Sequence, residues 1–113
     1  MLFALMKARA VLVPFTSDIQ IEMENLMAVA GGECLYRFDK TDRATFERFP
    51  AKEAPELVGK FRARRHPGLI VFTSGSTGKP KGILHDCDQV CLKFLKPRQG
   101  WRTIMFLLMD HFG

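Results

Sequence analysis

Residues 68–86 constrain the fold more than any other stretch, because an apolar run ends abruptly there at a loop of hydroxyl residues, glycines and lysines. The four residues 69–72 are all apolar, and two of them are β-branched. A short apolar run bounded by Gly68 and by polar residues predicts a buried strand. We therefore expect a polar loop to begin at the end of a core strand.

The loop has the composition of an oxyanion site. Gly75 and Gly78 allow positive φ and a close backbone approach, so that neighbouring amide N–H groups can turn toward an anion. Lys79 and Lys81 add two positive charges. The hydroxyl donors are Thr73, Ser74, Ser76 and Thr77. This combination suits a polyphosphate, although the composition alone is also typical of a flexible surface loop.

The order of the residues in the loop distinguishes it from a Walker A loop. Counting from Gly75, the position that a Walker A loop gives to its second glycine is Pro80. Residues 73–82 instead resemble the AMP-binding signature of the adenylate-forming superfamily, which includes acyl-CoA synthetases, luciferases and nonribosomal adenylation domains. Ten consecutive positions agree with that signature. The specific order and the preceding strand favour a phosphate-binding loop over a flexible linker.

The resemblance implies an α/β fold: a partial, mostly parallel sheet with crossover helices, taken from the large N-terminal domain of an adenylate-forming enzyme. Residues 1–113 would be a partial AMP-binding domain, incomplete at both ends. The family's Tyr-Gly-x-Thr-Glu and Thr-Gly-Asp segments and its C-terminal lysine are absent from the sequence. We therefore expect an ATP-dependent carboxylic acid:CoA ligase by family, and an inactive chain when it is isolated.

The resemblance also implies roles for individual residues. The loop would hold the β and γ phosphates of ATP, with Mg²⁺, and Lys81 would neutralise their charge. His111 falls on a family histidine that lines the acyl-adenylate pocket. The implied cofactor-binding residues are Thr73, Ser74, Gly75, Ser76, Thr77, Gly78 and Lys81. The partners would be a carboxylic acid, whose identity the sequence does not give, and CoA.

The N-terminal part predicts a strand–helix–strand unit. Residues 4–14 resemble another superfamily segment and depart from it at Arg9, where the family usually has glycine. We expect the end of a helix, a strand over 11–15 and a helix over 19–30 that Gly31 and Gly32 close. A strand over 34–38 should then join the first strand in one parallel sheet.

The rest of the sequence predicts a mostly irregular region before the loop and regular secondary structure after it. Residues 39–67 are rich in charges and prolines and read as a variable surface connection in which only 56–62 is helical. After the loop, we expect a strand over 82–85, a helix that Asp86 caps and that extends to Phe94, and an apolar strand over 103–108.

The charge and cysteine content raise two other functions, nucleic-acid binding and metal binding. The net charge is +5, and Lys60, Arg62, Arg64 and Arg65 form a basic cluster, but without an aromatic platform this cluster favours a solvated loop over a nucleic-acid site. His85, Cys87 and Cys91 lack a fourth metal ligand, so we predict packing and no metal site.

Apolar runs are too short for a membrane span, and three cysteines without a secretory signal predict a cytoplasmic protein. The alternative function is a truncated, non-catalytic phosphate-binding or interaction fragment.

Overall fold

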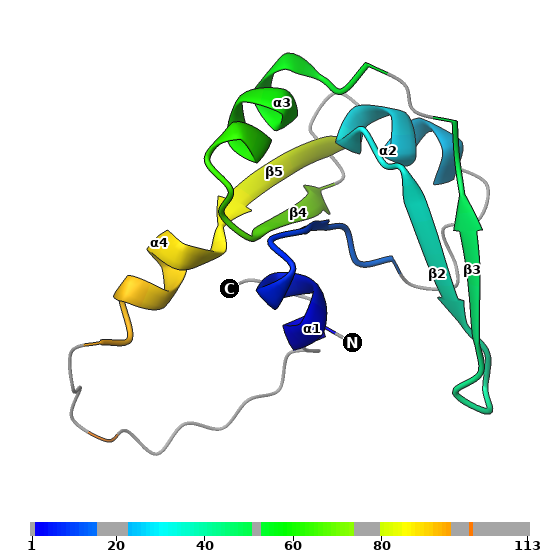
Figure 1. The fold of residues 1–113 in the computed structure, drawn as a ribbon, viewed down its shortest axis with the longest axis horizontal. Helices are drawn as coiled ribbons and strands as arrows, with labels where there is room; N and C mark the ends of the chain where they lie inside the picture. Colours follow the sequence, from blue (N-terminus) through cyan, green and yellow to red (C-terminus); the bar gives the residue numbers. More distant parts are fainter. Residues whose placement is uncertain (1, 16–22, 51–52, 74–79, 96–99, 101–113) are drawn as a thin grey trace.

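The computed structural model describes residues 2–15, 23–50, 53–73, 80–95 and 100, and Figure 1 shows their arrangement. The elements combine helices with strands, which confirms the α/β composition. In chain order they are α1 (Leu2–Lys7), β1 (Val11–Leu12), α2 (Met23–Ala30), β2 (Cys34–Phe38), β3 (Ala44–Arg48), α3 (Glu56–Ala63), β4 (Gly68–Thr73), β5 (Lys81–Asp86) and α4 (Cys87–Leu92).

The larger sheet contains three strands in the order β1-β4-β5. β1 runs parallel to β4, with Val11 opposite Gly68, whereas β5 runs antiparallel to β4. The prediction of a mostly parallel sheet is therefore wrong for the described residues, where the sheet is mixed. The connection over 74–80 is shorter than the dozen or so residues that a parallel crossover needs, and this length favours a hairpin.

The second sheet is a separate β2–β3 hairpin, so the prediction that residues 34–38 join the first strand is wrong. The turn between the strands explains the pairing. The Asp39 carboxylate accepts hydrogen bonds from Thr41 N at 2.7 Å, Thr41 Oγ1 at 2.7 Å and Arg43 N at 3.0 Å. Asp42 adopts a left-handed φ of 58°. These bonds, led by that of the Thr41 hydroxyl, lower the pKa of Asp39 and close a tight turn in the region predicted to be a surface connection.

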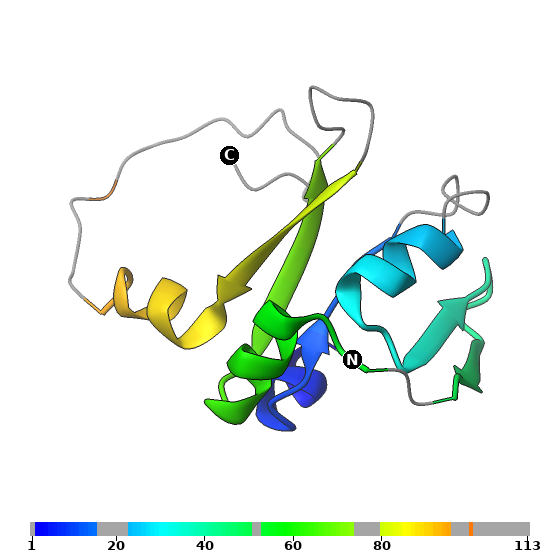
Figure 2. The same cartoon turned by 90° about the horizontal axis from the view of Figure 1, so that it is seen from above.

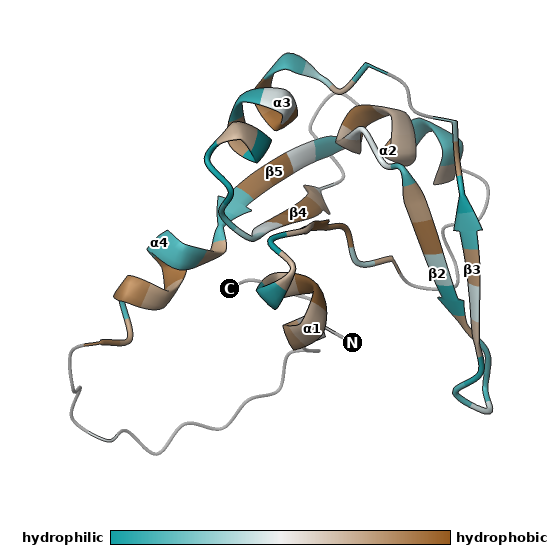
Figure 3. Cartoon of the chain, in the orientation of Figure 1, coloured by the Kyte–Doolittle hydropathy of each residue, from teal (hydrophilic) through white to brown (hydrophobic). Residues whose placement is uncertain are grey.

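The core lies between α2, α3 and one face of the β4–β5 hairpin. Ala30, Val58 and Ile70 are buried together, one from each of α2, α3 and β4. Figures 1 and 2 show both helices on the same side of this hairpin, and Figure 3 shows apolar residues along β4 and in the middle of β5. At Gly68 an added Cβ would lie 2.6 Å from Phe61 Cε1, so glycine permits α3 to pack this closely on the strand.

Three of the helices are followed by a left-handed residue: Arg9 after α1, Gly31 after α2 and Arg65 after α3. In α2 the cap residue is Gly31, with φ of 62°, as predicted. In α1 it is Arg9, with φ of 58°; Arg9 N donates to Met6 O at 2.9 Å and Ala10 N donates to Leu5 O at 3.0 Å. These paired bonds form a Schellman motif, whose left-handed position favours glycine. The structure thus gives a physical reason for the glycine that the resemblance expected where this chain has arginine.

Other predicted elements differ mainly in their ends. The strand predicted over 11–15 contains only Val11–Leu12, because Pro14 has no N–H to extend a ladder. Helix α3 and strand β4 are confirmed within one residue or so of their predicted bounds. Asp86 is confirmed as the N-cap of α4, which ends at Leu92 rather than Phe94. The start of the helix predicted over 19–30 and the strand predicted over 103–108 lie outside the described residues.

Candidate functional site: the loop end of the β4–β5 hairpin

Thr73 and Lys81 form the two described ends of the predicted phosphate loop. They are the last pair of the antiparallel β4–β5 ladder, so they lie directly opposite each other. Residues opposite each other in such a ladder have Cβ atoms about 4.5–5.5 Å apart on the same face of the sheet. Both residues are exposed. A hydroxyl and an ammonium group therefore project side by side into solvent where the loop begins and ends.

Strand parity places this pair on the face opposite the core. Ile70 is buried against α2 and α3, and Thr73 is three residues further along β4, so its side chain lies on the other face. Ile83, on the same face as Lys81, is 46% exposed. Among the described residues, neither α2 nor α3 therefore covers the pair.

The same edge collects the carboxyl ends of the two parallel strands. Because β1 runs parallel to β4, residues that follow β1 reach the end of the sheet that carries Thr73. Phe15 stacks on Phe72 there, with ring centroids 6.1 Å apart and an angle of 18° between the planes. Open α/β sheets bind ligands at the carboxyl ends of their parallel strands. This aromatic stack was not predicted from the sequence, because Phe15 and Phe72 are far apart in the chain.

A mostly apolar cavity of about 460 Å³ adjoins this edge. Its lining residues come from β1 and the segment after it, from α2 and from β2. They include Val13, Phe15, Met27, Leu35 and Tyr36, together with Arg62. Pockets of this size with apolar walls and a few polar groups are typical of small-molecule sites.

The other predicted site residues cannot be placed. Ser74, Gly75, Ser76, Thr77, Gly78 and His111 lie outside the described residues. Of the predicted set, the structure describes Thr73 and Lys81 and brings them together.

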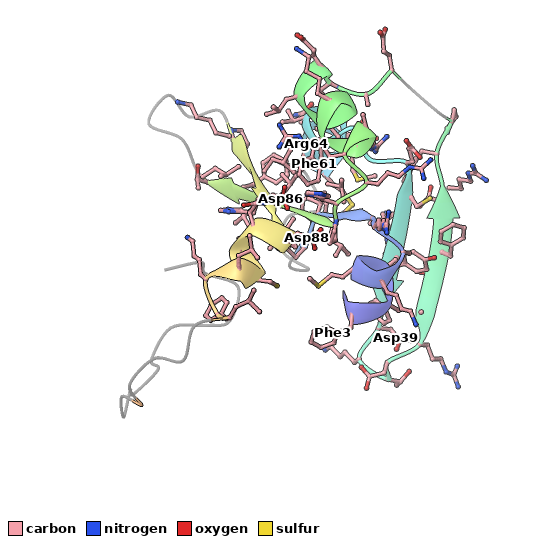
Figure 4. All side chains as sticks on the ribbon, turned by 60° about the vertical axis from the view of Figure 1, so that its left-hand side comes forward. Phe3, Asp39, Phe61, Arg64, Asp86 and Asp88 are labelled. Carbon is pink, nitrogen blue, oxygen red and sulfur yellow. The ribbon has the colours of Figure 1, made fainter. Side chains whose placement is uncertain are left out.

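The opposite end of the hairpin carries a cluster of His66, Asp86 and Asp88. His66 Nδ1 lies 2.9 Å from Asp86 Oδ2, and Asp86 Oδ1 accepts hydrogen bonds from Asp88 N and Gln89 N. The His66 bond is the main cause that lowers the pKa of Asp86. Asp86 is therefore already engaged by both oxygens in capping α4 and in holding His66. Figure 4 shows Asp86 and Asp88 where β5 runs into α4.

Within the described residues, His85, Cys87 and Cys91 form no metal-binding group. Burial is the main cause that raises the pKa of the half-buried Cys87 thiol, as expected for a packed cysteine. Cys91 is exposed, so the prediction of packing is wrong for this residue.

The basic cluster is more structured than a solvated loop. Arg62 lies in α3, forms an ion pair with Glu33 and donates to Gly31 O at 2.9 Å. Lys60 forms an ion pair with Glu56 one turn earlier. Both residues thus lie in the helix predicted over 56–62, and Arg62 ties this helix to the segment after α2.

None of the helices among residues 2–15, 23–50, 53–73 and 80–95 has the length and apolar character that crossing a membrane requires.

Comparison with curated proteins finds synthetases and ligases. The chain is 39% identical over 57 residues to malonate–CoA ligase of Arabidopsis thaliana, a match that covers 50% of this chain and 9% of the relative. It is 36% identical over 67 residues to acetyl-coenzyme A synthetase of Stutzerimonas stutzeri, covering 59% of this chain and 7% of the relative. It is 53% identical over 36 residues to N-benzoylphenylalaninol synthetase of Penicillium brevicompactum, covering 31% of this chain and 2% of the relative.

The chain thus matches less than a tenth of the length of each of these relatives. No family model matches the chain, and no solved structure gives a significant match. The matched relatives are nevertheless all adenylate-forming enzymes. Over these short stretches, the chain is similar to members of the adenylate-forming superfamily, as its loop sequence predicts.

Proposed function

We propose that residues 68–86 form the polyphosphate-binding hairpin of an ATP-dependent carboxylic acid:CoA ligase. The observation that carries this proposal is the pairing of Thr73 with Lys81 on an exposed face, at the end of the sheet where both parallel strands finish. Sequence similarity to acetyl-coenzyme A synthetase and malonate–CoA ligase supports the same class of enzyme. In this proposal, residues 1–113 are part of an AMP-binding domain.

Lys81 supplies the positive charge of the site. Because it is the first residue of β5 and is paired in the ladder, its backbone is fixed while its ammonium group stays in solvent. A rigid strand end lets one ammonium group stand at a defined place beside the phosphates, which reduces the cost of reorganisation during the reaction. The Thr73 hydroxyl adds a neutral donor on the same face.

The donor set fits the phosphates of ATP better than it fits a metal ion. Thr73, Pro80 and Lys81 offer one hydroxyl and one ammonium group but no carboxylate. Mg²⁺ prefers oxygen ligands and usually keeps phosphate oxygens and waters, so it would enter on ATP, with at most the Thr73 hydroxyl from these residues. When bound, it would offset phosphate charge.

The remaining parts of the proposal depend on the family resemblance. Ser74, Gly75, Ser76, Thr77 and Gly78 would complete the phosphate loop. His111 would contribute to the pocket for the activated acid, and CoA would be the acceptor. The apolar cavity beside Phe15 is a candidate for the apolar part of the acid. A cytoplasmic location stays a prediction.

Binding of ATP to the chain tests the proposal. Equilibrium dialysis with labelled ATP should show that Lys81→Ala weakens binding about tenfold or more, the loss expected for one charge-assisted contact. Lys93→Ala is the matched control, because it removes the same charge from an exposed residue beyond the other end of β5. We expect a change of less than about twofold in the control.

Equal losses of ATP affinity in the two variants would mean that ATP binding depends only on the net charge of the chain, and would overturn the proposal. Unchanged binding in Lys81→Ala would overturn it as well. Because Lys81 is exposed, its truncation removes no core packing, and circular dichroism should confirm an unchanged fold.

A further inference from the structure

A second cavity lies at the end of the β4–β5 hairpin that is remote from the loop. It has a volume of about 380 Å³ and opens between the C-terminal ends of α1 and α3. Its lining residues are Met6, Lys7, Arg9, Arg64, Arg65, His66, Pro67 and Asp88. Figure 4 shows Arg64 at the end of α3 and Asp88 in α4, on two sides of this region. From Gly68 to Thr73 the strand rises about 17 Å, so the cavity is separate from the proposed ATP site.

The charge of this cavity is strongly unbalanced. Lys7, Arg9, Arg64 and Arg65 face a single carboxylate, that of Asp88. Within the residues that the structure describes, none of these four cations forms an ion pair, whereas other basic side chains such as Lys60 and Arg62 do. Several cations around one concavity create a positive potential that attracts anions.

The backbone places two of these cations in an unusual conformation. Arg9 has a φ of 58° and Arg65 has a φ of 57°, and both follow the end of a helix. Glycine is favoured at such left-handed positions, and backbone strain of this kind is concentrated at binding and catalytic sites. Two helices therefore each end with an arginine where glycine would relieve strain, and both arginines line the same cavity.

Helix dipoles explain only part of this arrangement. Cations near the C-terminal end of a helix interact favourably with its negative end, which accounts for Lys7 in the last turn of α1. The dipole does not require arginine at the strained position itself, since a cation one or two residues away serves as well. A ligand that contacts both guanidinium groups gives a reason to keep them.

We propose that this cavity binds a small multivalent phosphorylated anion, independently of the loop. Guanidinium groups match the geometry of phosphate oxygens and can contact them in a bidentate manner. No Phe, Tyr or Trp side chain lines the cavity for a nucleic-acid base to stack on, and the imidazole of His66 is held by Asp86. This composition favours a compact phosphate group over an extended polynucleotide.

The test uses variants that should fold at least as well as the natural chain. Arg9→Gly combined with Arg65→Gly removes two cations at positions that favour glycine, so loss of binding would not reflect unfolding. Arg43→Ala combined with Arg48→Ala is the matched control, because it removes the same charge from exposed residues of the β2–β3 hairpin. Pyrophosphate is the probe, and amide NMR shifts report where it binds.

We expect pyrophosphate to shift the amides of Met6, Arg64 and His66 with a saturable dependence on its concentration. The double glycine variant should bind at least about tenfold more weakly at this site, while the control changes by less than about twofold. Lys81→Ala should leave these shifts unchanged, which separates this cavity from the loop. Linear, unsaturated shifts, or equal weakening in the glycine variant and the control, would overturn the proposal.

Discussion

Replacement of Arg9 tests whether the left-handed end of α1 is strained. The φ of 58° and the two Schellman hydrogen bonds fix this residue in a conformation that costs an L-residue about 1–2 kcal/mol. Glycine avoids this cost. It also gives the unfolded chain more conformational freedom, which lowers the free energy of unfolding by about 0.4–1 kcal/mol. Arg9→Gly should therefore be more stable than Arg9→Ala by about 0.5–1 kcal/mol.

The comparison between glycine and alanine is informative because both variants lose the same guanidinium group. Its interactions with the helix dipole and with the neighbouring cations cancel in the difference. Urea denaturation followed by circular dichroism measures the two free energies of unfolding. In thermal unfolding the same difference corresponds to a few degrees in Tm, roughly 2–6 °C for a chain of this size.

A control at Arg48 should give the opposite order. Arg48 ends strand β3 and is not among the described residues with positive φ. Glycine therefore relieves no backbone strain there and weakens the strand relative to alanine. An alanine variant at Arg9 that equals or exceeds the glycine variant would refute the reasoning, because it would mean that the left-handed conformation carries no cost.

Two further substitutions test the packing and capping that hold the hairpin. Asp86→Ala should cost about 1 kcal/mol by removing the cap of α4, whereas Asp86→Asn keeps a capping oxygen and should cost less. Because the pKa of Asp86 is lowered in the folded state, its contribution is complete above the usual carboxyl pKa near 3.9 and is lost as the pH falls through the folded value. Acid titration of stability should therefore show a smaller loss in Asp86→Asn, and an identical acid profile would contradict the assignment. Gly68→Ala should cost about 1–3 kcal/mol, because the new methyl group would overlap the buried ring of Phe61; denaturation with Gly59→Ala as the unhindered control measures this cost, and equal effects of the two variants would contradict it.

Local signals predicted individual elements well. The apolar run before the loop gave β4 with nearly its observed bounds, and Asp86 was recognised as a cap because it precedes an amphipathic segment. Gly31 was recognised as a helix end because glycine favours the left-handed conformation that it adopts. In each case the determining interactions lie within a few residues of one another.

Which strands pair with each other could not be predicted from such local signals. Residues 34–38 are a strand with the predicted bounds, but the partner is the following segment, since the Asp39 turn closes a hairpin. β3 was missed because its residues are all exposed and give no apolar run. A signal was present in the alternation of Thr45, Phe46 and Glu47, and Phe46 lies opposite Tyr36 with ring centroids 4.8 Å apart.

The candidate site likewise combines residues that the local sequence predicted with residues that only the fold brings together. The loop sequence predicted Thr73 and Lys81 as site residues, and the hairpin brings them together. The stack of Phe15 on Phe72 and the cavity between α1 and α3 combine residues that are distant in the chain. Their formation depends on the parallel pairing of β1 with β4, which no local pattern determines.

The central claim is that residues 68–86 form a functional polyphosphate hairpin with Lys81 as its charged residue. Its most direct test places these residues in acetyl-coenzyme A synthetase of Stutzerimonas stutzeri, in place of the residues that align with them, and measures acetyl-CoA synthesis. The family signature requires lysine after the proline and tolerates other residues before it. Lys81→Ala in the chimera should therefore lower kcat about a hundred- to thousandfold, and Lys79→Ala should have a much smaller effect. Equal losses in the two variants, or a larger loss in Lys79→Ala, would contradict the account.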